Sequence, residues 1–285
     1  MTVDVSQSPE RVVWIGGMPR SGTSWLAQLF ASSPDARLKL CPLFSYEFKN
    51  ELDWHSSVED WRQLFRRVYV TESEYLDQGF LRSDGLVPVF ADKAIEPTHL
   101  VIKSNRFHEL VAHAVAIGVP ARFLFIVRDP VSSIASWVLN PYEFPAEAQL
   151  EDQWRSGACR KTAAGEYWGF DDWVRVTRLH MALAADYPDM VRLVTYDDLL
   201  ESVSETAASL LLWAGLSVHQ QTIEFLEKSQ TEHSTHPRSV YKNPRRAARL
   251  YEQLPVPIRR EIEAELQGTE LEPFLRHRLE SSSDA

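Results

Sequence analysis

The segment GGMPRSGTSW, residues 16–25, decides how the rest of the sequence is interpreted. It follows a short apolar run at residues 12–15 and leads into residues 23–30, whose apolar positions have helical spacing. A strand, a glycine-rich turn and a helix start in this order can hold an anion, because free backbone N–H groups and the positive end of the helix dipole meet there. The segment therefore predicts an anion-binding turn.

The turn departs from the usual nucleotide-binding loop at one position. Gly17 and Gly22 match the Gly-x4-Gly part of that motif, but Thr23 stands where its lysine belongs. A kinase or GTPase without this lysine loses its main contact to the transferred phosphoryl group. Positive charge is supplied instead by Arg20, inside the turn. This favours an anion other than an ordinary nucleoside triphosphate.

Similar apolar runs recur along the chain and alternate with stretches of helical periodicity. Strands that are apolar at every position and separated by helices indicate a parallel sheet covered on both faces. We expect a three-layer α/β fold with a central parallel sheet, like that of the P-loop NTPases, in a single domain 1–285 with its core at 11–265. The further expected strands are 100–102, 123–127 and 191–194, and the expected helices are 107–117, 131–139, 168–186 and 199–214.

Composition excludes several classes of function. The chain has 285 residues and a formal net charge of −10, which disfavours a nucleic-acid partner. The only cysteines, Cys41 and Cys159, are too few for a disulfide framework and lack metal-ligand spacing. No basic, then apolar, leader precedes the first strand and no apolar run approaches the ~20 residues of a membrane span. We expect a cytoplasmic protein without a membrane or metal partner.

A second candidate anion site lies in ARFLFIVRDPVSSIASW, residues 121–137. Arg128 ends the expected strand, and Ser136 follows eight residues later. A guanidinium group can bind phosphate through two parallel hydrogen bonds, and a serine hydroxyl adds another donor. The alternative is that Arg128 only pairs with Asp129 before Pro130 begins a helix.

Together the two segments resemble the sulfotransferases that use 3′-phosphoadenosine 5′-phosphosulfate (PAPS). PRSGTSW is similar to their 5′-phosphosulfate loop, in which a Lys or Arg lies two residues before the second glycine, as Arg20 does. The resemblance implies that Arg128 and Ser136 bind the 3′-phosphate. It implies that the first loop binds the 5′ side through Pro19, Arg20, Ser21, Gly22, Thr23, Ser24 and Trp25.

Two weaker matches extend the resemblance. VTYDDLL, residues 194–200, is similar to a family segment whose tyrosine lies near the adenine, which would be Tyr196 here; a half-buried strand residue is the alternative. Residues 233–251 are basic and contain no acid, and they resemble the C-terminal loop that closes over the nucleotide. Arg238, Ser239 and Lys242 are its candidate contacts, unless the segment is a solvated basic loop.

The catalytic base is harder to assign. Lys103, at the end of another strand, should lie near the transferred group together with Arg20, but Asn105 stands where cytosolic sulfotransferases have their catalytic His. Asn cannot accept a proton at neutral pH. Golgi-type relatives use a Glu after the first helix, which makes Glu47 the first candidate, on one helical face with Glu51. His108 competes with it, and His55 is a third possibility.

The resemblance implies transfer of a sulfuryl group from PAPS to a hydroxyl, or else an amine, of a small-molecule, glycan or lipid-like acceptor, without a metal. Residues 140–173 are expected to form an acceptor lid because they are irregular and aromatic. The alternative for those rings is an ordinary core. Rival functions are a phosphotransferase or ATPase on the same fold, and a non-catalytic module that binds a nucleotide or a glycan. The expected aromatic lid residues are Trp154, Tyr167, Trp168, Phe170 and Trp173.

Overall fold

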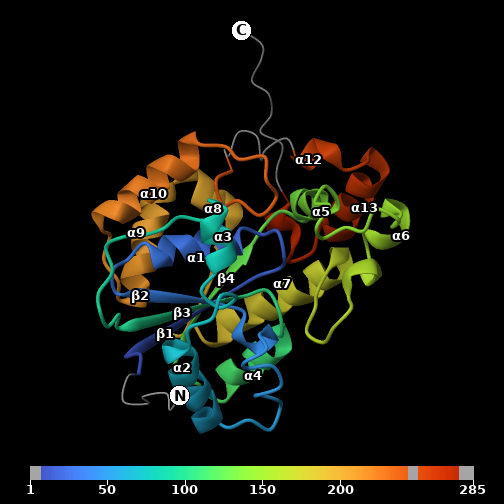
Figure 1. Cartoon of the computed structure of the whole chain (residues 1–285). Helices are drawn as coiled ribbons and strands as arrows, with labels where there is room; N and C mark the ends of the chain where they lie inside the picture. Colours follow the sequence, from blue (N-terminus) through green and yellow to red (C-terminus); the bar gives the residue numbers. More distant parts are fainter. Residues whose placement is uncertain (1–7, 243–249, 276–285) are drawn as a thin grey trace.

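The computed structural model describes residues 8–242 and 250–275. Its sheet has five strands, all parallel, in the order β2-β3-β1-β4-β5. Helices lie above and below this sheet (Figure 1). The strands are β1 (Arg11–Gly16), β2 (Ala36–Leu40), β3 (His99–Ser104), β4 (Arg122–Val127) and β5 (Val191–Thr195).

The helices connect the strands and continue beyond the last one. Short 3₁₀ turns occur at Pro42–Phe44, Ala158–Arg160 and Glu272–Phe274. The described α-helices are α1 (Thr23–Ala31), α2 (Val58–Val70), α3 (Gly79–Ser83), α4 (His108–Ala116), α5 (Pro130–Val138), α6 (Leu150–Gln153), α7 (Gly169–Asp186), α8 (Tyr196–Glu201), α9 (Val203–Ala214), α10 (Gln220–Thr231), α12 (Leu250–Gln253) and α13 (Val256–Leu266).

Successive side chains of the central strand point to opposite faces of the sheet, and each face has its own core. Val13 and Ile15 of β1 pack with α1, α9 and α10. Val12 and Trp14 of the same strand pack with α2, α4 and α7. Because both sets are buried, the strand is apolar at nearly every position. The predicted three-layer α/β fold with a central parallel sheet is confirmed.

The sequence analysis missed strand β2, whose sequence is ARLKL. Two charged residues, Arg37 and Lys39, interrupt its apolar pattern. Lys39 is buried, and its Nζ atom donates to Thr71 O at 2.5 Å and to Asp77 Oδ1 at 2.7 Å. Since those two partners come from another part of the chain, the residue pattern of the strand alone could not reveal it. The single helix expected at 199–214 is also wrong, because Ser202 separates α8 from α9.

The prediction of an aromatic lid over an acceptor is contradicted. All five rings expected there are buried in a third core, which includes residues of α5 and α13. Trp173 donates its Nε1–H to the carbonyl of Arg128 at 2.9 Å, so this core supports the end of β4 from behind. The rings stabilise the fold because they are packed against one another and against helices, rather than against the cavity described below.

The carboxyl edge of the sheet carries unusual backbone geometry. Three residues other than glycine have a positive φ just after a strand: Arg20 (69°) after β1, Cys41 (38°) after β2 and Phe107 (59°) after β3. This conformation is costly for residues with a Cβ and is concentrated at functional sites. The turns at this edge are therefore the place to examine for a site.

Trp14 supports the sheet on the α2 side, where its ring meets that of Trp61 edge-on at 5.8 Å. We predict that Trp14→Ala lowers the free energy of unfolding by about 3–5 kcal/mol, because it leaves a large cavity in a close-packed core. Trp54→Ala removes a ring that is 58% exposed and should change the free energy of unfolding by only about 0.5 kcal/mol. Equal effects of the two substitutions in urea denaturation would contradict this account of the core.

Candidate functional site

The first anion turn connects β1 to α1. Gly22 precedes the helix with a φ of 101°, and a Cβ there would lie 2.8 Å from the ring of Tyr196. Glycine is thus required both by the backbone and by the close approach of the ring. The Ser21 hydroxyl donates to Met18 O at 2.6 Å, which braces the turn from within. Ser21 was expected to contact a ligand, but it is buried and does not line the cavity.

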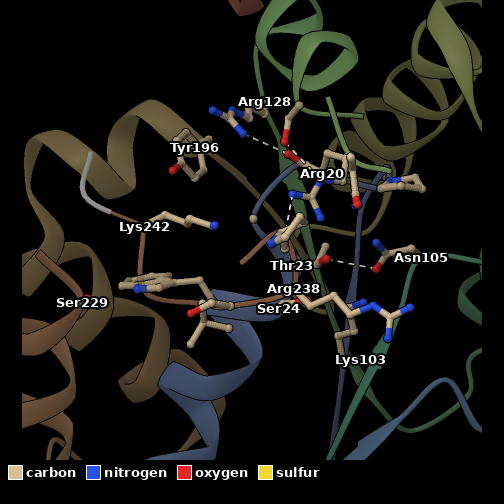
Figure 2. Close-up of a pocket in the computed structure, with 18 of the residues that line it drawn as sticks. Arg20, Thr23, Ser24, Lys103, Asn105, Arg128, Tyr196, Ser229, Arg238 and Lys242 are labelled. Carbon is tan, nitrogen blue, oxygen red and sulfur yellow. Dashed lines mark hydrogen bonds between the residues drawn. The ribbon is translucent and has the colours of Figure 1, made fainter. Parts of the chain in front are cut away.

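Arg20 lies at the centre of the site and joins the two predicted anion segments (Figure 2). Its Nε donates to Ser136 Oγ at 3.1 Å, and its Nη2 donates to Pro237 O at 3.2 Å. Arg128 Nη1 donates to the carbonyl of Arg20 at 3.1 Å. Three segments far apart in the sequence therefore meet around one guanidinium group.

Arg128 is held in place from two sides. Its guanidinium carbon lies 4.3 Å from the centre of the Tyr196 ring, a cation–π contact. The side chain of Asp129 accepts a hydrogen bond from Ser132 N at 2.7 Å and so caps α5. Asp129 therefore has a structural role at the start of α5. The guanidinium group of Arg128 points instead toward the turn that contains Arg20, whose carbonyl it contacts.

The turns and helices enclose a cavity of about 610 Å³. Among the described residues that line it, five are cationic and one, Glu143, is a carboxylate. This balance is opposite to that of the whole chain, with its formal net charge of −10. The cavity thus concentrates positive charge, which suits a ligand with several negative charges. The lining cations are Arg20, Lys103, Arg128, Arg238 and Lys242.

Burial raises the cost of these charges. Burial, opposed by Glu143 and aided by Arg128, lowers the pKa of Arg20. Burial also lowers the pKa of the Lys103 ammonium group. Burial and, to a lesser degree, the charge of Arg20 lower the pKa of Lys242 to about 8. An anion in the cavity would favour the charged form of each group.

The remaining predicted contacts from the first loop lie on this cavity. Pro19, Gly22, Thr23, Ser24 and Trp25 all line it. Thr23, in the position of the P-loop lysine, donates from Oγ1 to Asn105 Oδ1 at 3.0 Å (Figure 2). Because Asn105 accepts this hydrogen bond, it positions the Thr23 hydroxyl.

The basic C-terminal segment contributes a wall of the cavity as far as it is described. Arg238, Ser239 and Lys242 line the cavity, and the Lys242 ammonium donates to Ser234 O at 2.8 Å and to His236 O at 2.7 Å. The later part of the expected closing loop, residues 243–249, lies outside the described residues and includes Arg245, Arg246 and Arg249.

The structure places none of the three sequence-derived base candidates on the cavity. Glu47 is exposed, in a turn rather than the expected helix, and a hydrogen bond with Ser73 is the main reason that its pKa is lowered. His55 is exposed on a neighbouring loop. The chain after β2 forms a 3₁₀ turn and further turns instead of the expected helix, and neither side chain lines the cavity.

His108, unlike Glu47 and His55, is buried in the core. Its ring packs edge-on against Tyr167 at 4.7 Å and against His180 at 5.0 Å, behind the sheet. Burial, with a smaller effect of Arg175, lowers the pKa of His108 to about 3. Burial also lowers the pKa of His180 well below its usual value. The two histidines are neutral members of the core.

Sequence reasoning missed residues that the structure brings to the cavity. Gln78, Phe80 and Leu81 come from the segment around α3, and Ser229 and Gln230 come from α10. Asn140 and Glu143, in the turn after α5, were assigned only to an irregular segment. No motif in the sequence marks these residues, since they reach the cavity through the packing of surface helices and turns.

No group of three or more His, Cys, Asp and Glu side chains within residues 8–242 and 250–275 could hold a metal ion. Over the same residues, none of the helices combines the length and the apolar character that crossing a bilayer requires.

The comparison with protein families decides the class. Residues 13–220 match the model of the sulfotransferase family. The chain belongs to the sulfotransferase family. The match includes both anion segments and the turn after α5, and it ends at the start of α10. The enzyme class inferred from PRSGTSW is confirmed. No protein of curated function gives a significant sequence match.

Solved structures agree on the fold. Mouse sulfotransferase SULT7A1 complexed with PAP has a TM-score of 0.51 at 14% identity, over 95% of this chain and 89% of that one. Retinol dehydratase in a complex with retinol and PAP has a TM-score of 0.52 at 13% identity, over 94% and 84%. The sulfotransferase domain from the curacin biosynthetic pathway has a TM-score of 0.50 at 16% identity, over 92% and 98%.

The buried histidines generate a prediction about pH. A lowered pKa means that the folded state favours the neutral ring, so their contribution is complete above the unfolded pKa of about 6.5 and is lost as the pH falls below it. We predict that the free energy of unfolding decreases from pH 6.5 to pH 5 by up to about 1.4 kcal/mol per pH unit for each histidine.

Urea denaturation at several pH values measures this slope. His180→Phe removes one titrating ring from the aromatic cluster and should reduce the slope, whereas His55→Asn changes an exposed ring and should leave it unaltered. If the free energy of unfolding of His180→Phe falls with pH as steeply as that of the wild type, then titration of His180 does not cause the pH dependence.

Proposed function

We propose that this sulfotransferase uses PAPS as its donor and transfers the sulfuryl group to a hydroxyl of a small-molecule, glycan or lipid-like acceptor. The observation that carries the proposal is the hydrogen bond from Arg128 to the carbonyl of Arg20, which joins the ends of two neighbouring strands around one cationic cavity. A nucleotide with phosphates on both its 3′ and 5′ positions presents two anions at separate points of one ribose. The geometry suits such a ligand.

Several features support the fit of this donor. The first turn ends at Gly22, which lines the cavity directly before the N-terminus of α1, where free backbone N–H groups can bind an anion. Arg20 Nε donates to Ser136 Oγ, so the guanidinium group and the hydroxyl lie next to each other. Both groups can donate hydrogen bonds to the oxygens of a bound phosphate. Trp25, whose ring lies 5.8 Å from that of Phe225, offers an aromatic surface at the same cavity. PAP is also present in two of the three solved structures named above, those of mouse SULT7A1 and retinol dehydratase.

Each residue then has a role. Bound PAPS supplies an activated sulfuryl group whose leaving group is a phosphate. Arg20, Lys103 and the N–H groups of the first turn would stabilise negative charge on the oxygens around sulfur, and removing one such preorganised donor typically lowers the rate by ~10²–10³. Arg128 and Ser136 would bind the 3′-phosphate. Tyr196, Arg238, Ser239 and Lys242 would line the nucleotide.

The acceptor requires separate support, because the retinol in the retinol dehydratase structure is a ligand of that protein. The cavity of about 610 Å³ is in the size range of small-molecule sites. Leu40 and Leu139 add apolar surface next to Lys103 and Asn105. An acceptor with an apolar body and one reacting hydroxyl suits this part of the lining.

The rival functions make different predictions. A phosphotransferase or ATPase would need a lysine in the place of Thr23, whose hydroxyl here is bonded to Asn105. A non-catalytic nucleotide-binding or glycan-binding module would bind without turnover. Isothermal titration calorimetry should therefore give strong binding of PAP and weak binding of ATP, and PAPS should be converted to PAP when an acceptor is supplied.

Arg128→Ala tests the assignment of the 3′-phosphate. Because a hydrogen bond to a charged group contributes about 1.5–3 kcal/mol, the substitution should weaken PAP binding roughly tenfold to hundredfold. AMP has no 3′-phosphate, so its affinity should change much less. Arg66→Ala, on the exposed surface of α2, is the matched control and should alter neither affinity. Equal losses for PAP and AMP in calorimetry would remove the assignment.

A further inference from the structure

The carboxylate of Glu143 is the only one among the described residues that line the cavity. Its Oε2 atom lies 3.7 Å from Arg20 Nη1, beyond hydrogen-bond distance, and close enough for an ion pair. The charge of Glu143 also reaches Lys103. Glu143 thus places a carboxylate in the cavity beside Arg20, one of the two cations assigned to the sulfuryl group.

Two buried polar atoms of the same turn have no hydrogen-bond partner within the described part of the chain. One is Glu143 Oε2, an acceptor, and the other is Asn140 Nδ2, a donor. Asn140 is only 1% exposed, and its Oδ1 accepts from Tyr142 N at 3.1 Å, which fixes the amide so that Nδ2 is the free atom. Unsatisfied buried polar atoms are rare and costly, and a ligand is one way to satisfy them.

The turn that carries both atoms is held by its own hydrogen bonds. Glu143 N donates to Asn140 O at 2.9 Å, and Asn140 N donates to Trp137 O at 2.9 Å. The buried indole of Trp137 donates to Glu143 O at 3.1 Å. The backbone of this turn and the Asn140 amide are therefore fixed in place before any ligand binds, which is typical of residues that support catalytic and binding groups.

We propose that Asn140 and Glu143 bind the reacting group of the acceptor, that this group is a neutral hydroxyl, and that Glu143 is the catalytic base. A hydroxyl both donates and accepts, so it can satisfy Glu143 Oε2 and Asn140 Nδ2 together. An alkyl amine is protonated at neutral pH, and its ammonium group only donates, so it would leave the Asn140 amide unsatisfied and add positive charge beside Arg20. It would also have to lose a proton before its nitrogen could attack sulfur. This inference rests on the proposed function and specifies its acceptor.

In the proposed sulfuryl transfer, the acceptor O–H proton passes to the Glu143 carboxylate while the acceptor oxygen forms a bond to sulfur. The bond between sulfur and the bridging phosphate oxygen breaks, and PAP leaves with that electron pair. Arg20 and Lys103 stabilise the charge that develops on the oxygens around sulfur. After the sulfated product leaves, Glu143 returns its proton to water.

His233 is the other lining residue that could act as a neutral base, so the experiment includes it. Purified full-length protein is given PAPS and matched pairs of acceptors: octanol and octylamine, cyclohexanol and cyclohexylamine, benzyl alcohol and benzylamine. Products are measured by mass spectrometry. Wild-type enzyme should sulfonate alcohols in preference to the corresponding amines.

Glu143→Gln should lower kcat for the best alcohol by ~10²–10⁴, the usual contribution of a general base, with a smaller change in KM. Its affinity for PAP, measured by calorimetry, should be equal or higher, because Arg20 loses a competing carboxylate. Glu143→Asp keeps the carboxylate and should keep part of the activity. Asn140→Asp keeps the oxygen that accepts from Tyr142 N, removes the free donor, and should mainly raise KM for alcohols.

Glu147→Gln is the matched control, since it makes the same chemical change four residues away on an exposed side chain that does not line the cavity. It should leave kcat and KM unchanged. The inference is overturned if amines are preferred, if no alcohol is sulfonated while PAP binds, or if His233→Asn abolishes turnover while Glu143→Gln does not. Failure of the proposed function is a different result, absence of PAP binding, and it would remove both.

Discussion

The structure depends on cationic side chains that converge at the carboxyl edge of one parallel sheet with little negative charge to balance them. Arg128 is buried at the end of β4 and Lys103 at the end of β3, and the Arg20 turn after β1 lies between them. Such groups are expensive to keep in a folded protein without a counter-charge. Arg128 is held by two aromatic residues: Trp173 donates to its backbone carbonyl from the core, and the Tyr196 ring contacts its guanidinium group at the cavity. A nucleotide with two phosphate groups would offset this cost, so its binding is expected to stabilise the site.

The sequence predicted the parts of this arrangement that are local. Apolar runs revealed four of the five strands, and the order of strand, turn and helix at PRSGTSW located the first anion turn. Strand β2 was missed because Lys39 in its middle is neutralised by partners distant in the sequence. The five aromatic rings of the segment before and within α7 were misinterpreted for a related reason. An aromatic residue in a sequence can be expected either to pack in a core or to contact a ligand. The tertiary packing decides between the two, and here it places all five rings in the core.

The same limit applies to the acceptor side. Glu47 and His108 were reasonable choices by analogy, yet one is exposed and the other is sealed in the core. Glu143 was visible in the sequence only as an acid within an irregular segment. Its position depends on how the turn after α5 folds back over Arg20, through hydrogen bonds that no motif encodes. The residues proposed to bind the donor lie at strand ends, where sequence motifs can reveal them. Those proposed to bind the acceptor lie in a turn that no motif marks.

The most direct test of the central claim is a crystal structure of the protein with PAP. We expect one PAP molecule in the cavity, with its 5′-phosphate bound by Arg20 and by free backbone N–H groups of the turn between β1 and α1, and its 3′-phosphate bound by Arg128 and Ser136. A structure in which the Arg20 turn and Arg128 contact different molecules, or in which the 3′-phosphate is free in solvent, would contradict it.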